Sequence, residues 1–241
     1  MTLVRRAWRW SADQWVRVVR VLYYQFFFDA PRVSSSNRLA ARVEAWERQQ
    51  GRGDVPISKA LWEQQYRTGH WDFLRTLGEL GRFSLVVGYI HELKPQAAVL
   101  DVGCGEGLLF QRLQPRGCAR YLGLDISAAA VARACEAGGG PFICADAEEY
   151  VPTDTYDVIV FNESLYYLNK PLETVDRYLT RLAQRGIMIV STFPTSRRGR
   201  SILRALKRSY TLLDETRISH ASESWICSVF LPSSEVMPPK G

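Results

Sequence analysis

Five short apolar runs alternate with helical stretches between residues 97 and 192, and this alternation restricts the fold more than any other feature of the chain. Strands that alternate with helices at this spacing form a parallel sheet with helices on both faces. The runs are 97–102, 120–126, 141–146, 156–163 and 186–192, and the intervening helical stretches are 107–114, 127–137 and 171–184. Two further runs, 210–220 and 223–231, follow each other directly and predict an antiparallel pair at one edge of the sheet.

The segment that precedes these runs is helical in pattern. Residues 2–30 carry apolar side chains at spacings of three and four, which predicts an amphipathic helix, and a second polar helix is expected near 37–50. The apolar stripe of the first helix could pack on the rest of the chain, cap an active site or lie on a membrane surface. We predict a helical extension or cap over 1–58 and a catalytic domain over 59–241.

Composition excludes several classes of protein. The 241 residues are 46% hydrophobic and 12% aromatic, enough for one sizeable folded domain. The net charge of +6 is concentrated in the first fifty residues and in the runs "SRRGR" and "RALKRS", so a dedicated nucleic-acid binder is not expected. Five cysteines without a Cys-x-x-Cys pair favour reduced, mostly buried thiols. No cleavable leader or membrane-length apolar run is evident, so we expect a cytoplasmic protein without stable membrane insertion.

A glycine-rich turn follows the first strand, in "VLDVGCGEGLLF". Gly103, Gly105 and Gly107 lie where the backbone of such a sheet comes closest to its ligand. The dinucleotide fingerprint would place the third glycine one residue later, and Asp101 would repel a phosphate group. The ligand is therefore expected to carry an amino group and no diphosphate.

Aspartates also end the next two strands. The Asp125 carboxylate can accept hydrogen bonds from both hydroxyls of a ribose, and Asp146 with the backbone of Ala147 suits the exocyclic amine of adenine. Any single aspartate at a strand end is more often a helix N-cap or a solvated side chain. Three in succession are a more specific indication of a nucleoside that carries an amine.

With this glycine-rich turn and these aspartates, the chain resembles the class I S-adenosylmethionine-dependent methyltransferases. Their first four motifs are similar to "VLDVGCGEG", "LGLDIS", "CADAEEY" and "YDVIVFNESLYYL", and the resemblance covers about residues 60–231. It implies a Rossmann-like, mostly parallel seven-stranded sheet with an antiparallel last strand, and S-adenosylmethionine as cofactor. The cofactor-binding residues that it implies are Asp101, Gly103, Cys104, Gly105 and Gly107 for the methionine part, Asp125 and Ile126 for the ribose, and Asp146 and Ala147 for adenine.

The resemblance also implies that aromatic side chains upstream of the first motif touch the cofactor. The segment "LWEQQYRTGHW" supplies Trp62, Tyr66 and Trp71 as candidates. The alternative is that these rings only pack a linking helix on the sheet.

Catalysis of methyl transfer requires alignment and, for a weakly acidic acceptor, a base. Residues of the fourth motif face the methyl group in the family, which makes Asn162, Glu163 and Tyr166 the catalytic candidates. Glu163 could orient or deprotonate the acceptor, and Tyr166 or Tyr167 could lay its ring against the sulfonium. Glu163 as a solvated or capping carboxylate remains an alternative, as does His220 as a base.

The absence of other motifs narrows the acceptor. "FNES" differs from the Asn/Asp-Pro-Pro-Tyr of enzymes that methylate exocyclic amines of bases, and neither a Pro-Cys pair nor a metal-binding pattern is visible. We expect a small-molecule acceptor from specialised metabolism, methylated at an amine, hydroxyl or carbon, with no nucleic-acid partner and no metal. Two alternatives remain: cyclisation of S-adenosylmethionine to azetidine-2-carboxylate and methylthioadenosine, and binding of S-adenosylmethionine without catalysis. The sequence gives no indication of the oligomeric state.

Overall fold

The computed structural model describes residues 57–114, 117–194, 197–221 and 223–232. The two helices expected within residues 2–50 lie outside the described residues. The same holds for all but the last two residues of the predicted extension over 1–58. The division of the chain at residue 58 therefore stays a prediction.

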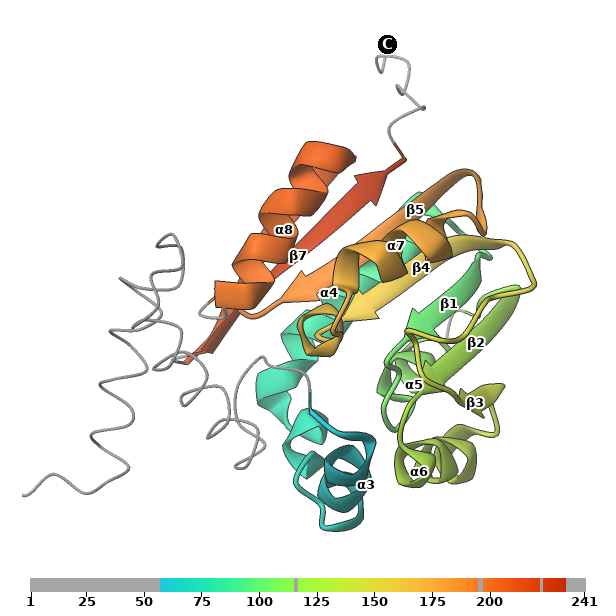
Figure 1. Ribbon diagram of the computed structural model, residues 1–241, viewed down its shortest axis with the longest axis vertical. Helices are drawn as coiled ribbons and strands as arrows, with labels where there is room; N and C mark the ends of the chain where they lie inside the picture. The colour runs from blue at the N-terminus through green and yellow to red at the C-terminus, as the bar shows by residue number, and fades with distance from the viewer. Residues whose placement is uncertain (1–56, 115–116, 195–196, 222, 233–241) are drawn as a thin grey trace, which may run out of the picture. The chain divides into compact units, whose positions relative to one another are not determined.

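The strands form one seven-stranded sheet in the order β3-β2-β1-β4-β5-β7-β6 (Figure 1). The first five strands pair in parallel, and β7 pairs antiparallel with both β5 and β6. This confirms the mostly parallel sheet with an antiparallel last strand. The strands are β1 (Ala98–Val102), β2 (Arg120–Asp125), β3 (Phe142–Cys144), β4 (Tyr156–Asn162), β5 (Leu182–Thr192), β6 (Thr211–His220) and β7 (Glu223–Leu231).

Helices cover both faces of this sheet, which is why most residues of the central strands β4 and β5 are buried. One apolar core lies between the sheet and α4 (Leu77–Leu93) and α5 (Leu108–Leu113). The other lies between the sheet and α7 (Pro171–Leu179) and α8 (Arg197–Ser209), which Figure 1 shows in front of the strands. Helix α6 (Ala128–Gly138) packs against β2, β3 and α5. The three remaining helical segments of the described residues are α3 (Lys59–Arg67), η2 (Asp72–Arg75) and η3 (Leu165–Tyr167).

Two segments differ from the prediction. The helix expected to reach residue 184 ends at Leu179, because the chain pairs with β4 from Leu182 onward across an irregular register. Helix α8 was not predicted, because its many arginines and lysines hid a short apolar stripe. That stripe buries Ile202, Leu203 and Leu206.

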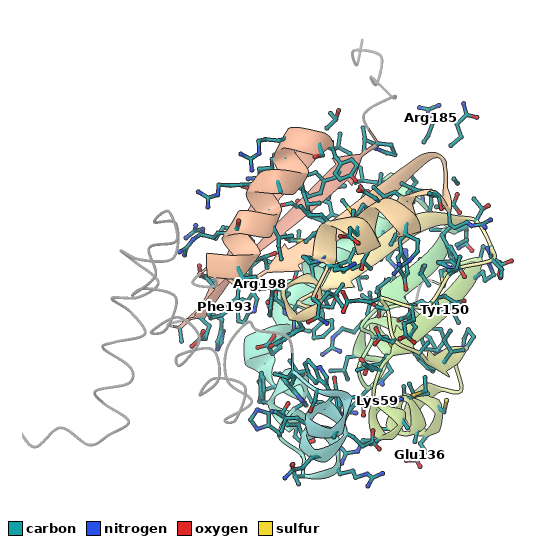
Figure 2. All side chains as sticks on the ribbon, in the orientation of Figure 1. Lys59, Glu136, Tyr150, Arg185, Phe193 and Arg198 are labelled. Atoms are coloured by element: carbon teal, nitrogen blue, oxygen red, sulfur yellow. The ribbon has the colours of Figure 1, made fainter. Side chains whose placement is uncertain are left out.

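The carboxyl ends of β1 to β5 share one edge of the sheet, called the carboxyl edge below. Figure 1 shows α3 at the end of the sheet toward which the arrows of β1 and β2 point. In Figure 2, Phe193 follows β5 at this edge, whereas Arg185 lies at the opposite end of the same strand. In folds of this kind the ligand binds beyond the carboxyl ends of the strands.

Candidate functional site

The glycine loop between β1 and α5 has left-handed backbone conformations at all three of its glycines. Their φ angles are 80° at Gly103, 54° at Gly105 and 70° at Gly107, values that residues other than glycine rarely adopt. The protein itself also crowds the loop: a Cβ on Gly103 would lie 2.6 Å from Ser164 Cβ, and one on Gly105 would lie 2.8 Å from Tyr66 Oη. A Cβ on Gly107 would lie 2.7 Å from Phe142 Cζ. All three glycines are therefore required by neighbouring side chains as well as by backbone geometry.

Asp101 lies on β1 directly before this loop and is buried. Its Oδ2 accepts a hydrogen bond of 2.6 Å from Tyr121 Oη, while Oδ1 is buried and has no partner among the described residues. Burial raises the pKa of Asp101 to about 7, although the bond from Tyr121 opposes this shift. A buried carboxylate oxygen without a donor is costly, and a cationic amine would satisfy it.

Asp125 ends β2 with both carboxylate oxygens oriented by backbone amides. Oδ2 accepts from Gly105 N at 2.9 Å, and Oδ1 accepts from Ser127 N at 2.9 Å. Burial raises the pKa of Asp125 to about 6, and the hydrogen bonds from the backbone amides oppose this shift. Ile126 directly follows the last residue of β2, and its carbonyl accepts a weak hydrogen bond from Cys144 Sγ. The carboxylate is thus fixed beside the glycine loop.

Asp146 and Ala147 lie in the turn after β3. Asp146 Oδ1 accepts from Glu148 N at 2.8 Å, so this aspartate takes the turn-capping role that was the alternative to ligand binding. The carbonyl of Ala147 accepts from Arg177 Nη2 at 2.8 Å. One carboxylate oxygen of Asp146 and the carbonyl of Ala147 are therefore already engaged, and the turn that would face adenine is held in place.

The candidate rings upstream of β1 gather beside the glycine loop, and we call Trp62, Tyr66, Trp71 and Tyr167 the aromatic wall. The centroid of Trp62 lies 5.3 Å from Trp71 and 6.2 Å from Tyr66, with the rings stacked, and 4.9 Å from Tyr167, edge to face. Tyr66 is buried, and Trp71 Nε1 is buried with no partner among the described residues. The rings pack on one another and also border the loop, so the two interpretations of these residues are compatible.

Two carboxylates that the sequence analysis missed fasten this upstream segment to the sheet domain. Glu63 of α3 accepts hydrogen bonds from Ser127 Oγ at 2.8 Å and Ala129 N at 3.1 Å, at the N-terminus of α6. Glu106, in the glycine loop, is buried and accepts from Arg75 and Arg133, each at 2.6 Å. The aromatic wall is therefore tied to the glycine loop by polar contacts as well as by ring packing.

The fourth motif places Glu163 directly after β4. Its φ of 59° is a strained backbone conformation for a residue other than glycine. Its Oε2 accepts from Tyr166 Oη at 2.6 Å, and its Oε1 accepts from Ser191 Oγ at 2.5 Å. Burial raises the pKa of Glu163, and these two hydrogen bonds oppose this shift. The carboxylate is thus held by side chains of η3 and β5. The ring of Tyr166 lies 4.6 Å from that of Tyr167.

Asn162, the third catalytic candidate, contacts a buried ion pair that the sequence analysis also missed. Arg82 Nη1 donates to Asn162 Oδ1 at 2.5 Å, and Arg82 Nη2 donates to Glu79 at 2.7 Å. Glu79 and Arg82 share the buried face of α4 with Phe83, Val86 and Ile90. Two charged residues on an apolar stripe were the signal in the sequence.

The remaining candidates lie apart from this cluster or carry no further indication. His220 is exposed at the end of β6, with its ring against Gly78 of α4, and no bond to Glu163 is present. All five cysteines are free, but Cys135 and Cys144 are exposed, so the expectation that the thiols are mostly buried holds only in part. Among the described residues, no group of three His, Cys, Asp or Glu side chains could hold a metal ion, and no helix could cross a membrane.

Comparison with known proteins gives matches to methyltransferases. Residues 70–230, about two thirds of the chain, match the family described as "Methyltransferase domain". A malonyl-[acyl-carrier protein] O-methyltransferase of Anoxybacillus flavithermus is 27% identical over 145 residues, covering 57% of this chain and 54% of the relative. A trans-aconitate 2-methyltransferase of Streptomyces avermitilis is 31% identical over 131 residues, covering 49% of each chain. The chain spans about half the length of the curated relatives it matches.

Solved structures share the fold at low sequence identity. The N-methyltransferase NodS of Bradyrhizobium japonicum, in complex with S-adenosylhomocysteine, is 20% identical with a TM-score of 0.62, covering 72% of this chain and 98% of NodS. The magnesium protoporphyrin IX methyltransferase of Synechocystis with bound S-adenosylmethionine is 18% identical with a TM-score of 0.55, covering 71% of this chain and 96% of that one.

Proposed function

Because the chain belongs to the class I S-adenosylmethionine-dependent methyltransferases, we propose that it methylates an amine or hydroxyl group of a small-molecule acceptor, with Glu163 as the base. The observation that carries this proposal is the placement of the Glu163 carboxylate. It lies at the carboxyl edge, held by the hydroxyls of Tyr166 and Ser191, in surroundings that raise its pKa. A carboxylate fixed in this way is suited to accept a proton.

S-adenosylmethionine, the cofactor of this family, supplies an electrophilic methyl group on a sulfonium. The residues at the carboxyl edge fit it. Asp101 Oδ1, which has no partner in the described part of the chain, would receive the methionine amine, and Asp125 would accept the ribose hydroxyls. Gly103, Cys104, Gly105 and Gly107 form the backbone beside the methionine part, Ile126 would contact the nucleoside, and the turn of Asp146 and Ala147 would face adenine.

The aromatic wall and Tyr166 would face the positive charge of the sulfonium. The face of an aromatic ring attracts a cation, and the attraction strengthens when water is excluded. Trp62 and Tyr167 meet edge to face beside the loop, and Tyr166 reaches Glu163 from the same turn as Tyr167. We assign these rings to the enclosure of the reacting centre, with Tyr66 and Trp71 nearer to the methionine part.

The nucleophile we favour carries a proton that must be removed. Glu163 would receive this proton while the nucleophile forms its bond to the methyl carbon and the carbon–sulfur bond breaks. Asn162, held by Arg82, would orient the acceptor beside it. We propose that the acceptor is a metabolite of specialised metabolism. We also propose that the protein acts in the cytoplasm, without a nucleic-acid partner and without insertion into a membrane.

A second candidate acceptor is a carboxylic acid. Two relatives are named for malonyl-[acyl-carrier protein] and trans-aconitate, which both contain carboxylates, and the first is linked to a protein. A carboxylate oxygen is already a deprotonated nucleophile and needs no base. The raised pKa of Glu163 and its two hydrogen-bond donors would then have no role in catalysis, which is why we place this candidate second.

The predicted extension over 1–58 remains our proposal for a cap over the acceptor site, and it rests on the sequence alone. Amphipathic helices at the N-terminus can exclude water from a methyltransferase site. Such a cap would determine which acceptors enter.

The product formed from S-adenosylmethionine tests the proposed function directly. The purified full-length protein is incubated with S-adenosylmethionine alone and with pooled metabolite extracts, and the nucleoside products are identified by chromatography with mass detection. We expect S-adenosylhomocysteine only when extract is present, together with one metabolite heavier by a methyl group. Asp125→Ala protein serves as the control for contaminating activity.

Other products would contradict the proposal in distinct ways. Methylthioadenosine formed without extract, faster than in a protein-free control, would show cyclisation. Calorimetric binding of S-adenosylmethionine without either product would indicate a binding protein. A methylated carboxylic acid, free or on a carrier protein, would establish the second candidate.

Binding of S-adenosylhomocysteine is expected to weaken as the pH falls below 7. Burial raises the pKa of Asp101 to about 7, and the ligand amine needs the ionised carboxylate, so binding should release protons near neutral pH. We expect the affinity to fall roughly tenfold between about pH 7.5 and about pH 6, measured by calorimetry. Asp101→Asn should bind more weakly and lose most of this dependence; a flat wild-type profile would contradict the role of Asp101.

A further inference from the structure

A chain of polar side chains runs beneath Glu163, from α4 across the ends of β4 and β5. Arg82 is 2% exposed and donates from Nε and Nη2 to Glu79 Oε2, at 3.0 and 2.7 Å. Its third nitrogen, Nη1, donates to Asn162 Oδ1 at 2.5 Å. A guanidinium group only donates hydrogen bonds, so this contact fixes which end of the Asn162 amide faces Arg82.

At the other end of this series of polar side chains, Ser191 lies between two hydrogen-bond acceptors, Asn162 Oδ1 and Glu163 Oε1. Its hydroxyl is buried and lies 3.0 Å from Asn162 Oδ1 and 2.5 Å from Glu163 Oε1. A hydroxyl has one proton to donate and can accept from other donors. When Glu163 is ionised, the shorter contact indicates that the proton of Ser191 is directed to Glu163.

The same geometry also satisfies a protonated Glu163. The carboxyl O–H can then donate to Ser191 Oγ, and Ser191 can turn its own proton to Asn162 Oδ1. Asn162 Oδ1 keeps its bond from Arg82 in both cases. Neither protonation state leaves a buried polar atom of Ser191 or Asn162 Oδ1 without a partner, and such an atom would be costly.

We propose that Ser191, Asn162 and Arg82 are positioning residues that allow Glu163 to take up and release a proton in every catalytic cycle. Ser191 reverses the direction of its hydrogen bond with the state of Glu163, and Arg82 holds the far end of the chain in place. The inference rests on the proposed function, in which Glu163 receives the proton of the acceptor. It adds the means by which the buried site tolerates the change of charge.

The surroundings of Glu163 keep both of its states accessible. Burial raises its pKa, the charge of Arg82 and the hydroxyls of Ser191 and Tyr166 oppose this shift, and the charge of Glu79 adds to it. The thiol of Cys227 on β7 also interacts with Glu163, and its own pKa is raised by burial. Removing a donor to the ionised carboxylate should therefore raise the pKa of Glu163 further.

Titration of Glu163 in the full-length protein, without any acceptor, tests this inference. Glutamate is labelled with carbon-13 at the side-chain carboxyl, and the Glu163 signal is assigned by its loss in Glu163→Gln. We expect Ser191→Ala to raise the pKa of Glu163 by roughly 1 to 2, because a hydrogen bond to a charged acceptor is lost. Ser191→Thr retains the hydroxyl and should titrate like the wild type.

Ser228→Ala is the matched control. Ser228 is a buried serine on the adjacent strand β7, and its hydroxyl donates to Glu215 at 2.8 Å, outside this chain of contacts. This variant should leave the titration of Glu163 unchanged. Arg82→Lys, which retains the charge but lacks the planar group, should titrate close to the wild type yet lower kcat once an acceptor is known.

The results separate the inference from the proposed function. An unchanged pKa of Glu163 in Ser191→Ala, or an equal shift in Ser228→Ala, would overturn the inference. Calorimetric binding of S-adenosylhomocysteine shows whether each variant keeps an intact site. If the titration shifts as expected but the product assay detects no methylated acceptor, the proposed function fails and the proton-tolerant network stands only as a property of the buried site.

Discussion

Asp125→Ala is expected to weaken binding of S-adenosylhomocysteine by roughly a hundredfold or more. The carboxylate would accept both ribose hydroxyls, and each charge-assisted bond contributes about 1.5 to 3 kcal/mol. The substitution also leaves Gly105 N and Ser127 N without their acceptor, so the glycine loop loses part of its support. Calorimetry of the purified variant measures the dissociation constant.

Two further variants separate ligand contact from loop support. Asp125→Asn keeps the size and one acceptor oxygen, and it should bind with an affinity between those of the wild type and Asp125→Ala. Asp176→Ala removes an exposed aspartate of α7 that accepts a hydrogen bond from the Tyr210 hydroxyl. This variant should leave the affinity for S-adenosylhomocysteine unchanged. Wild-type affinity in Asp125→Ala would show that Asp125 does not bind the ribose.

Glu163→Gln is expected to lower kcat by roughly a hundredfold to ten-thousandfold for an amine or hydroxyl acceptor. The amide has nearly the shape of the carboxylate but cannot accept the proton. S-adenosylhomocysteine affinity should stay within about twofold of the wild type, because Glu163 is assigned no contact with the nucleoside. The acceptor found in the product assay serves as substrate in steady-state measurements.

The pH dependence gives an independent check on the same residue. The base must be ionised to act, so kcat/KM of the wild type should rise with pH through the raised pKa of Glu163, and Glu163→Gln should lack this rise. Glu215→Gln, on β6, is the matched control and should keep the wild-type profile. Full activity of Glu163→Gln with an amine or hydroxyl acceptor would show that Glu163 is not the base.

The positions of the strands and of the glycine loop were predictable from the sequence because they follow from local patterns. Apolar runs bounded by turns gave the strands. Asp101 and Asp125 could be placed together because the carboxyl ends of parallel strands share one edge. The glycines of the loop predict room for a ligand, whereas the structure shows that Ser164, Tyr66 and Phe142 also require them.

The sequence by itself determined the α/β class, the order of motifs along the sheet and the residues at its carboxyl edge, since each is a local property of a strand and the turn after it. The tertiary structure decided which side chains surround Glu163. Arg82 lies 80 residues before Asn162 in the chain, and Ser191 lies 28 residues after Glu163. Contacts over such separations depend on how helices pack on the sheet and on the register of its strands, which periodicity in the sequence does not encode.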